Sequence, residues 1–172
     1  FLAVPEPALR PLSGGESIAV GGRIFEVLYT PGHAVHHVTY LDTAERTAYV
    51  GDTAGIAVGG YVLAATPPPD IDVPRWEESL TAIAGLGPAS LFLTHFGVVP
   101  DAAGHLTRYR AVLRRAADRA REAVRAGGEE PALTEAWDGE RDAAALRRAV
   151  PDDAVRDQVA RRFDTFKAAW IE

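Results

Sequence analysis

The sequence has 172 residues, of which 47% are hydrophobic and 24% charged, so it has the size of one domain and too large an apolar share for wholesale disorder. Its net charge of -6 is uneven, because residues 1–104 hold 4 basic and 11 acidic residues whereas residues 105–172 hold 14 basic and 13 acidic ones. Cysteine is absent, which excludes disulfides, thiolate metal sites, iron–sulfur clusters and a cysteine nucleophile.

The first part of the chain predicts short β-strands. After a proline-containing start, residues 17–20 and 23–29 read as a hairpin, because Gly21 and Gly22 tolerate the positive φ angles of a two-residue turn. A loop is expected over the glycine-rich residues 51–60. The remaining strands are predicted at residues 37–41, 47–50, 61–65 and 90–93.

One helix is predicted before the last of these strands, and helices dominate the chain after it. Asp72 can cap a helix whose first turn holds Pro74 and whose apolar side chains recur at helical spacing from Trp76 onward. Further helices are predicted at residues 106–126, around 142–149 and after Pro151, the last with an apolar stripe that ends at Trp170. The chain therefore belongs to the α/β fold class and changes from strand-rich to helical near residue 100.

Three side chains of metal-binding types come directly after predicted strands. His33 lies in a Thr-Pro-Gly-His turn, Asp52 follows a glycine, and His95 lies in a Thr-His-Phe-Gly segment. Loops at strand ends are where rigid scaffolds usually present functional groups. Two imidazoles and one carboxylate suit zinc or non-haem iron. The sequence therefore indicates a metal site that contains His33, Asp52 and His95.

These segments resemble the metal-binding motifs of the metallo-β-lactamase-fold hydrolases, most closely the glyoxalase II-like and lactonase-like branch. Residues 30–33, 51–52 and 94–97 look like the third, fourth and fifth motifs in the right order. The resemblance covers about residues 15–100 and implies an αββα sandwich. It implies that residues 1–104 are the C-terminal half of that fold and that residues 105–172 form a helical extension, as a lid, a dimer contact or both.

The resemblance also assigns roles. His33 would complete the histidine set of a first metal ion, His95 would bind a second, and Asp52 would bridge the two as the catalytic carboxylate. The implied cofactors are two divalent metal ions, most readily zinc, with iron and manganese as alternatives. A metal-bound hydroxide would then attack an ester, thioester or lactone. The expected function is a metal-dependent hydrolase with a small-molecule substrate.

One part of the family pattern is absent. The upstream His-x-His-x-Asp-His run, which supplies four further ligands in that family, has no counterpart, because no histidine precedes His33. The chain also begins with Phe1 and contains no methionine. We therefore expect hydrolase activity in the complete protein and an inactive site in this chain alone.

The other histidines favour supporting roles. His37 is expected to donate a hydrogen bond that orients a ligand or the backbone. His36 points either into the mouth of the site or to solvent, and His105 is expected to be structural or at the surface. Along the arginine-rich helix, Asp118 and Glu122 are interleaved with the arginines, which favours a solvated face over a nucleic-acid surface.

Two alternative functions use the same residues. One is a mononuclear iron enzyme of the same fold that oxidises a persulfide, in which His95 is not a ligand. The other is a non-catalytic binding module that retains the fold. In each case we expect no nucleic-acid partner, because the acidic first part of the chain does not suit one. We also expect no membrane partner, because no apolar run approaches roughly 18 residues. The lack of a signal-peptide pattern favours a cytoplasmic location, and a homodimer is one arrangement that the helical extension allows.

Overall fold

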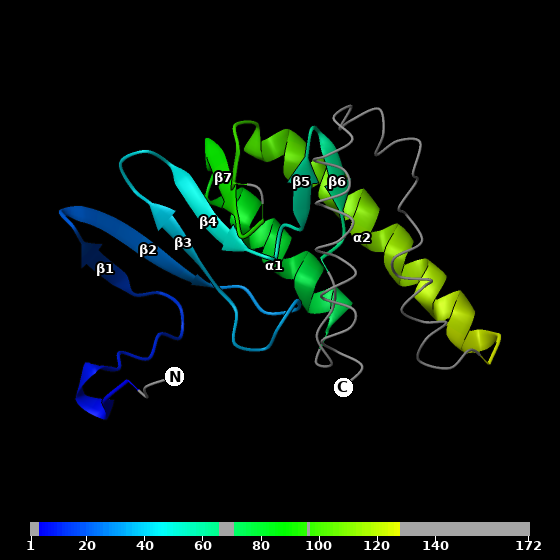
Figure 1. Ribbon diagram of the computed structural model, residues 1–172, viewed down its shortest axis with the longest axis horizontal. Coiled ribbons are helices and arrows are strands. Elements are labelled where there is room, and N and C mark those ends of the chain that lie inside the picture. Colours follow the sequence, from blue (N-terminus) through cyan, green and yellow to red (C-terminus); the bar gives the residue numbers. More distant parts are fainter. Residues whose placement is uncertain (1–3, 66–70, 96, 128–172) are drawn as a thin grey trace, which may run out of the picture.

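The computed structural model describes residues 4–65, 71–95 and 97–127. Its largest element is a six-stranded mixed sheet with the strand order β1-β2-β3-β4-β7-β8 (Figure 1). These strands are β1 (Ser17–Val20), β2 (Arg23–Tyr29), β3 (Val38–Asp42), β4 (Thr47–Gly51), β7 (Ser90–Leu93) and β8 (Gly97–Val99). Two further strands, β5 (Ile56–Val58) and β6 (Tyr61–Leu63), form a separate antiparallel pair.

A 3-10 helix η1 (Glu6–Ala8) precedes the strands, the helix α1 (Val73–Gly85) lies between β6 and β7, and the helix α2 (Ala102–Arg125) follows β8. The helix α1 begins as predicted, because the Asp72 carboxylate accepts a hydrogen bond from the backbone N–H of Arg75. The helix α2 begins before the expected residue 106, because Asp101 caps it by accepting from the N–H of Gly104. No helix in the described part of the chain combines the length and the apolar composition that crossing a bilayer requires.

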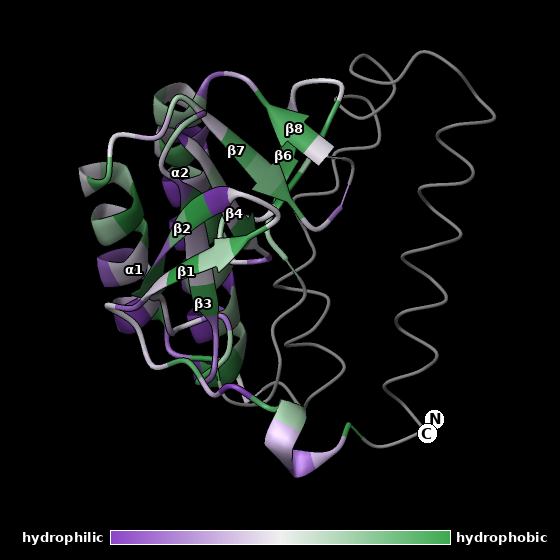
Figure 2. Cartoon of the chain, turned by 90° about the vertical axis from the view of Figure 1, so that its left-hand side faces the viewer, coloured by the Kyte–Doolittle hydropathy of each residue, from purple (hydrophilic) through white to green (hydrophobic). Residues whose placement is uncertain are grey.

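The core lies between one face of the sheet and the two helices. Leu41, Ala48 and Leu91 are partners on the neighbouring strands β3, β4 and β7, and all three are fully buried. In Figure 2 the strands β7 and β8 are coloured mostly as apolar, whereas the helix α1 carries both apolar and polar colours. The helices add the buried side chains Trp76, Leu80, Ile83, Leu106, Tyr109 and Leu113. The first part of the predicted helical extension thus packs into the same core as the sheet.

Three local expectations differ from the structure. The loop expected at residues 51–60 contains the strand β5, and residues 97–99 form the strand β8. Each of these strands has three residues, too few for an alternating pattern to show. His37 lies directly before β3 instead of within it. The helices predicted around 142–149 and after residue 151 lie outside the described residues.

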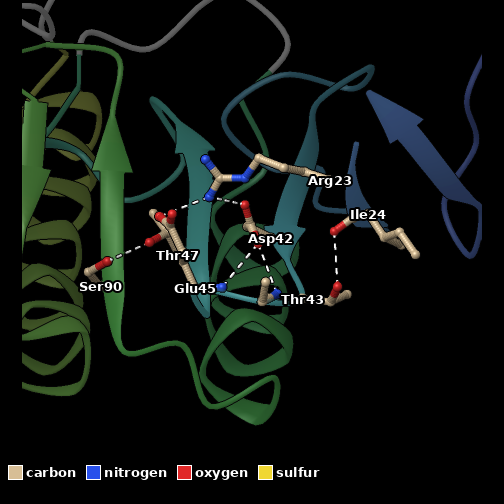
Figure 3. A network of polar contacts seen from close by, with 8 residues as sticks. Arg23, Ile24, Asp42, Thr43, Glu45, Thr47 and Ser90 are labelled. Atoms are coloured by element: carbon tan, nitrogen blue, oxygen red, sulfur yellow. Dashed lines mark hydrogen bonds and ion pairs between the residues drawn. The ribbon is translucent and has the colours of Figure 1, made fainter. Parts of the chain in front are cut away.

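A polar network holds the sheet edge where β4 and β7 begin (Figure 3). The Asp42 carboxylate accepts a hydrogen bond from the backbone N–H of Glu45, which is the main cause that lowers the pKa of Asp42. The Arg23 guanidinium forms ion pairs with both Asp42 and Glu45. The hydroxyls of Thr47 and Ser90 lie 2.9 Å apart and join β4 to β7. This edge is therefore tied together by structural contacts, and the opposite edge carries the candidate site.

Candidate metal centre

The three predicted ligands follow strands that end at one edge of the sheet. The strand β3 is antiparallel to both β2 and β4, and β4 is parallel to β7. Strands β2, β4 and β7 therefore run in one direction and end side by side. His33 follows β2, Asp52 follows β4 and His95 follows β7. The topology thus brings together residues that lie far apart in the sequence.

Asp52 lies between the two histidines. Its Oδ2 atom is 3.7 Å from Nε2 of His33, and its Oδ1 atom is 3.5 Å from Nε2 of His95. The side chains are 12% exposed for His33, 30% for Asp52 and 32% for His95, so a small molecule can reach them. The Oδ1 atom of Asp52 is itself buried and accepts no hydrogen bond from the described residues. A carboxylate in this state has capacity left for a cation.

A divalent metal ion fits these donors chemically. Imidazole nitrogen and carboxylate oxygen both bind Zn²⁺ at about 2 Å, and a tetrahedral ion at that distance separates its donor atoms by roughly 3.3 Å. The two gaps of 3.5 and 3.7 Å are close to that separation. However, no group of three or more histidine, aspartate or glutamate side chains among the described residues forms a complete metal-binding cluster. The ligand roles of His33, Asp52 and His95 therefore stay predictions.

The turn that carries His33 packs tightly on helix α1. Gly32 has a φ angle of +123°, and a Cβ atom there would lie 2.2 Å from the backbone nitrogen of Trp76. Only glycine allows both this conformation and this close approach. The Ser79 hydroxyl donates to the carbonyl oxygen of Pro31 at 2.6 Å. The ring of Trp76 meets the ring of His33 edge-on, with centroids 5.1 Å apart.

The loop that carries Asp52 is held from both helices. The Trp76 indole donates from Nε1 to the carbonyl oxygen of Thr53 at 2.6 Å. From α2, His105 donates from Nε2 to the carbonyl oxygen of Ala54 at 2.8 Å. His105 is buried, and this burial lowers the pKa of its imidazole. The predicted structural alternative for His105 agrees with these contacts.

His37 lies between the two loops. Its Nδ1 atom is 2.9 Å from the Thr30 hydroxyl and 3.0 Å from the Thr53 hydroxyl. A Cβ atom on Gly51 would lie 2.4 Å from its Nε2 atom, so the imidazole rests on the backbone just before Asp52. Burial lowers the pKa of His37 to about 4, and the electrostatic effect of the neighbouring His33 adds to this lowering. His37 is therefore neutral near pH 7 and contacts the loops of two predicted ligands. The neighbouring His36 is exposed.

Some contacts of the site were not predicted from the sequence. Thr30 opens the Thr-Pro-Gly-His turn and Thr53 directly follows Asp52, so their positions were a usable signal. The contact between Trp76 and Thr53 joins residues 23 positions apart, and no local pattern reveals it.

A cavity of about 470 Å³ borders the other side of the His33 turn, beside the N-terminal end of α1. Its lining includes the apolar Val35 and Ile71 and the basic Arg75 and Arg121. None of the three predicted ligands lines it. This cavity is therefore next to the candidate centre and not part of it.

Comparison with known proteins gives one consistent family. The family model of the metallo-beta-lactamase superfamily matches residues 1–95. The lactamase-like protein nscB of Neosartorya fischeri is 31% identical over 106 residues, which cover 62% of this chain and 30% of that protein. The hydroxyacylglutathione hydrolase of Acidiphilium cryptum is 37% identical over 82 residues, which cover 48% of this chain and 31% of that protein.

Solved structures show the same fold. The archaeal superfamily protein ST1585 from Sulfolobus tokodaii superposes with a TM-score of 0.52 and 32% identity, covering 59% of this chain and 38% of that chain. A beta-lactamase domain protein from Burkholderia ambifaria reaches a TM-score of 0.54 at 22% identity over 70% of this chain and 38% of its own, which supports the fold alone.

The predicted α/β fold class and the predicted family are both confirmed. The chain spans about a third of the length of the curated relatives it matches, so it covers part of the fold. The family is metal-dependent, and most of its members are hydrolytic enzymes. The match over residues 1–95, together with the sheet and helices shared with the solved relatives, shows that this chain belongs to the metallo-beta-lactamase superfamily.

Proposed function

We propose that this chain supplies His33, Asp52 and His95 to the metal centre of a hydrolase that acts on an ester, thioester or lactone. The observation that supports this most directly is the Asp52 carboxylate, whose two oxygens face one imidazole each at 3.7 and 3.5 Å. The similarity to a protein named hydroxyacylglutathione hydrolase supports a hydrolytic reaction. Which substrate is cleaved, which metal is bound and how many subunits assemble are properties of the complete protein.

Each side chain has a defined task in this proposal. Bound metal ions lower the pKa of a coordinated water and polarise a carbonyl oxygen, which is the chemistry that cleavage of these bonds needs. His33 and His95 present Nε2, the atom that faces Asp52, as the metal donor. The negative charge of Asp52 would offset the repulsion between two dications. The partial exposure of Asp52 and His95 leaves room for a substrate.

The substitution Asp52→Ala tests the metal assignment. We expect the Co²⁺ affinity of the chain to fall at least tenfold in a titration followed by absorbance, since changes even beyond the direct ligands cost 10- to 100-fold. In the complete protein, we expect the same substitution to lower turnover of a thioester and lactone panel by roughly 100-fold or more. The matched control is Asp118→Ala, which removes an exposed carboxylate that pairs with Arg121 on α2.

The two halves of the proposal fail in different ways. If the wild-type chain and the Asp52→Ala chain bind Co²⁺ equally, Asp52 is not a metal ligand. If neither chain binds Co²⁺, the three residues do not form a metal site in this chain. If metal binds but the complete protein cleaves no ester, thioester or lactone, the hydrolase assignment is wrong. Oxygen uptake with ferrous iron would then favour the persulfide-oxidising alternative.

A further inference from the structure

Trp76 contacts the loops of two predicted ligands at once. Its side chain is completely buried, and its backbone lies against Gly32, next to His33. Its ring packs edge-on against the His33 imidazole with centroids 5.1 Å apart and planes inclined by 61°. Its Nε1 atom donates a 2.6 Å hydrogen bond to the carbonyl oxygen of Thr53, the residue after Asp52. One rigid indole thus joins the turn after β2 to the loop after β4.

The surroundings of Trp76 keep the indole in place. The ring of Tyr109 packs beside it from α2, with centroids 6.1 Å apart. On the same helix, one turn further along, Ser79 makes its hydrogen bond to Pro31 and adds a second tie to the His33 turn. The indole N–H is buried, so loss of its acceptor would leave an unsatisfied polar group in the core. A change in the separation of the two loops must either break this hydrogen bond or lift the ring from His33.

We propose that Trp76 is a positioning residue that fixes the separation of His33 and Asp52 before a metal ion binds. This inference rests on the proposed function, in which those two side chains are metal ligands. It adds a residue outside the ligand motifs and gives a physical reason for the 3.7 Å distance between His33 Nε2 and Asp52 Oδ2. The helix α1 then positions the predicted metal ligands and also contributes side chains to the hydrophobic core.

The first test uses the metal-free 172-residue chain and the variant Trp76→Phe, which keeps an aromatic ring and removes the indole N–H. The reporters are the amides of Thr53 and Gly55, which donate to the carbonyl oxygens of Val50 and Asp52. We expect these two amides to exchange hydrogen at least fivefold faster in Trp76→Phe. The amide of Thr43, bonded to Ile24 at the opposite sheet edge, serves as the internal reference for global opening.

The matched control is Leu80→Val, which removes one buried methylene from the same helix and leaves the indole hydrogen bond to Thr53 in place. We expect it to change the Thr43 reference and the two loop amides by the same factor. If Trp76→Phe and Leu80→Val accelerate the loop amides equally relative to Thr43, Trp76 has a packing role only and the inference is wrong. In the wild-type chain the Trp76 indole N–H must also be protected from exchange, and rapid exchange of that proton overturns the inference whether or not Trp76→Phe folds.

The second test measures Co²⁺ affinity of the same chains. We expect Trp76→Phe to weaken binding about tenfold, in the range found for residues that orient metal ligands, and Leu80→Val to leave it unchanged. Equal affinity in wild type and Trp76→Phe overturns the inference. If the wild-type chain binds no Co²⁺ while the loop amides respond only to Trp76→Phe, the proposed function fails and the positioning of the two loops stands.

Discussion

Among single residues, His37 has the clearest electrostatic consequence. Its imidazole contacts two threonine hydroxyls and a glycine backbone, and burial lowers its pKa from 6.5 to about 4. A histidine whose folded pKa is below its unfolded value takes up a proton less readily in the folded chain. Above pH 6.5 the imidazole is neutral in both the folded and the unfolded chain, so it does not lower the free energy of unfolding. As the pH falls from 6.5 toward 4, the unfolded chain takes up a proton that the folded chain does not, and the free energy of unfolding decreases.

The substitution His37→Asn removes this titration, because an amide can occupy the place of Nδ1 and does not ionise in this range. Between pH 7.5 and pH 5, we expect the metal-free wild type to lose about 2 kcal/mol more free energy of unfolding than His37→Asn. Urea denaturation at the two pH values measures this difference. His36→Asn, at the exposed neighbouring position, is the control and should follow the wild type. Parallel pH profiles for wild type and His37→Asn would contradict the assignment.

Some residues of the candidate site can be predicted from the sequence, and others cannot. His33, Asp52 and His95 were identifiable because each residue type binds metals and each follows a predicted strand. Their closeness was implied by the family resemblance, and the sheet topology explains it. The indole of Trp76 was not identifiable as a neighbour of the Asp52 loop, because that contact depends on how α1 docks on the sheet. Such docking is set by many weak packing contacts that no short motif records.

At the scale of elements, the site depends on how α1 and α2 are held together. The Arg114 guanidinium donates two hydrogen bonds to the Glu77 carboxylate, at 2.6 and 2.5 Å. One turn along, Arg110 donates to the hydroxyl of Thr81 at 2.7 Å. The hydrogen bond from Arg114 is the main cause that lowers the pKa of Glu77. Because α1 carries Trp76 and α2 carries His105, this pairing also keeps both helices in reach of the Asp52 loop.

The substitution Glu77→Gln should lower the free energy of unfolding by less than about 1 kcal/mol at pH 7, since the pair is partly exposed and screened by solvent. The folded pKa of Glu77 is below its unfolded value, so the contribution is present above about 4.5 and is lost as the pH falls below it. Urea denaturation at pH 7 and pH 4, with and without added salt, checks this. The exposed neighbour Glu78→Gln is the control. Equal losses in the two variants would show that the pair contributes nothing measurable.

Helices and strands differ in how well the local sequence predicts them. Asp72 and Pro74 marked the start of α1 correctly, because a capping carboxylate and a first-turn proline are local signals. The earlier start of α2 at Ala102 was missed because Asp101 is also a cap but is followed by small residues without an apolar pattern. The strands β5 and β8 are three residues long. Whether such short segments form strands depends on the strands they pair with, β6 and β7, more than on their own composition.

For the molecule as a whole, the sheet has two unlike faces. The helices cover one face, and the other presents an aromatic row in which the ring of Tyr49 packs against Phe25 on one side and Phe92 on the other. Phe92 and Val98, partners on β7 and β8, remain exposed in the described part of the chain. The family resemblance predicted two stacked halves, and this chain spans about a third of the length of its curated relatives.

The number of donors sets an upper limit on metal binding by this chain. All five histidines are at positions 33, 36, 37, 95 and 105, and the structure brings only His33 and His95 to Asp52. A catalytic zinc ion takes about three protein ligands, so three donors are too few for two tightly bound ions. We therefore expect elemental analysis of the dialysed 172-residue chain, with intact mass on the same sample, to find at most one zinc or cobalt ion per chain. Two tightly held ions per chain would contradict this limit and would assign additional ligands to carboxylates elsewhere in the sequence.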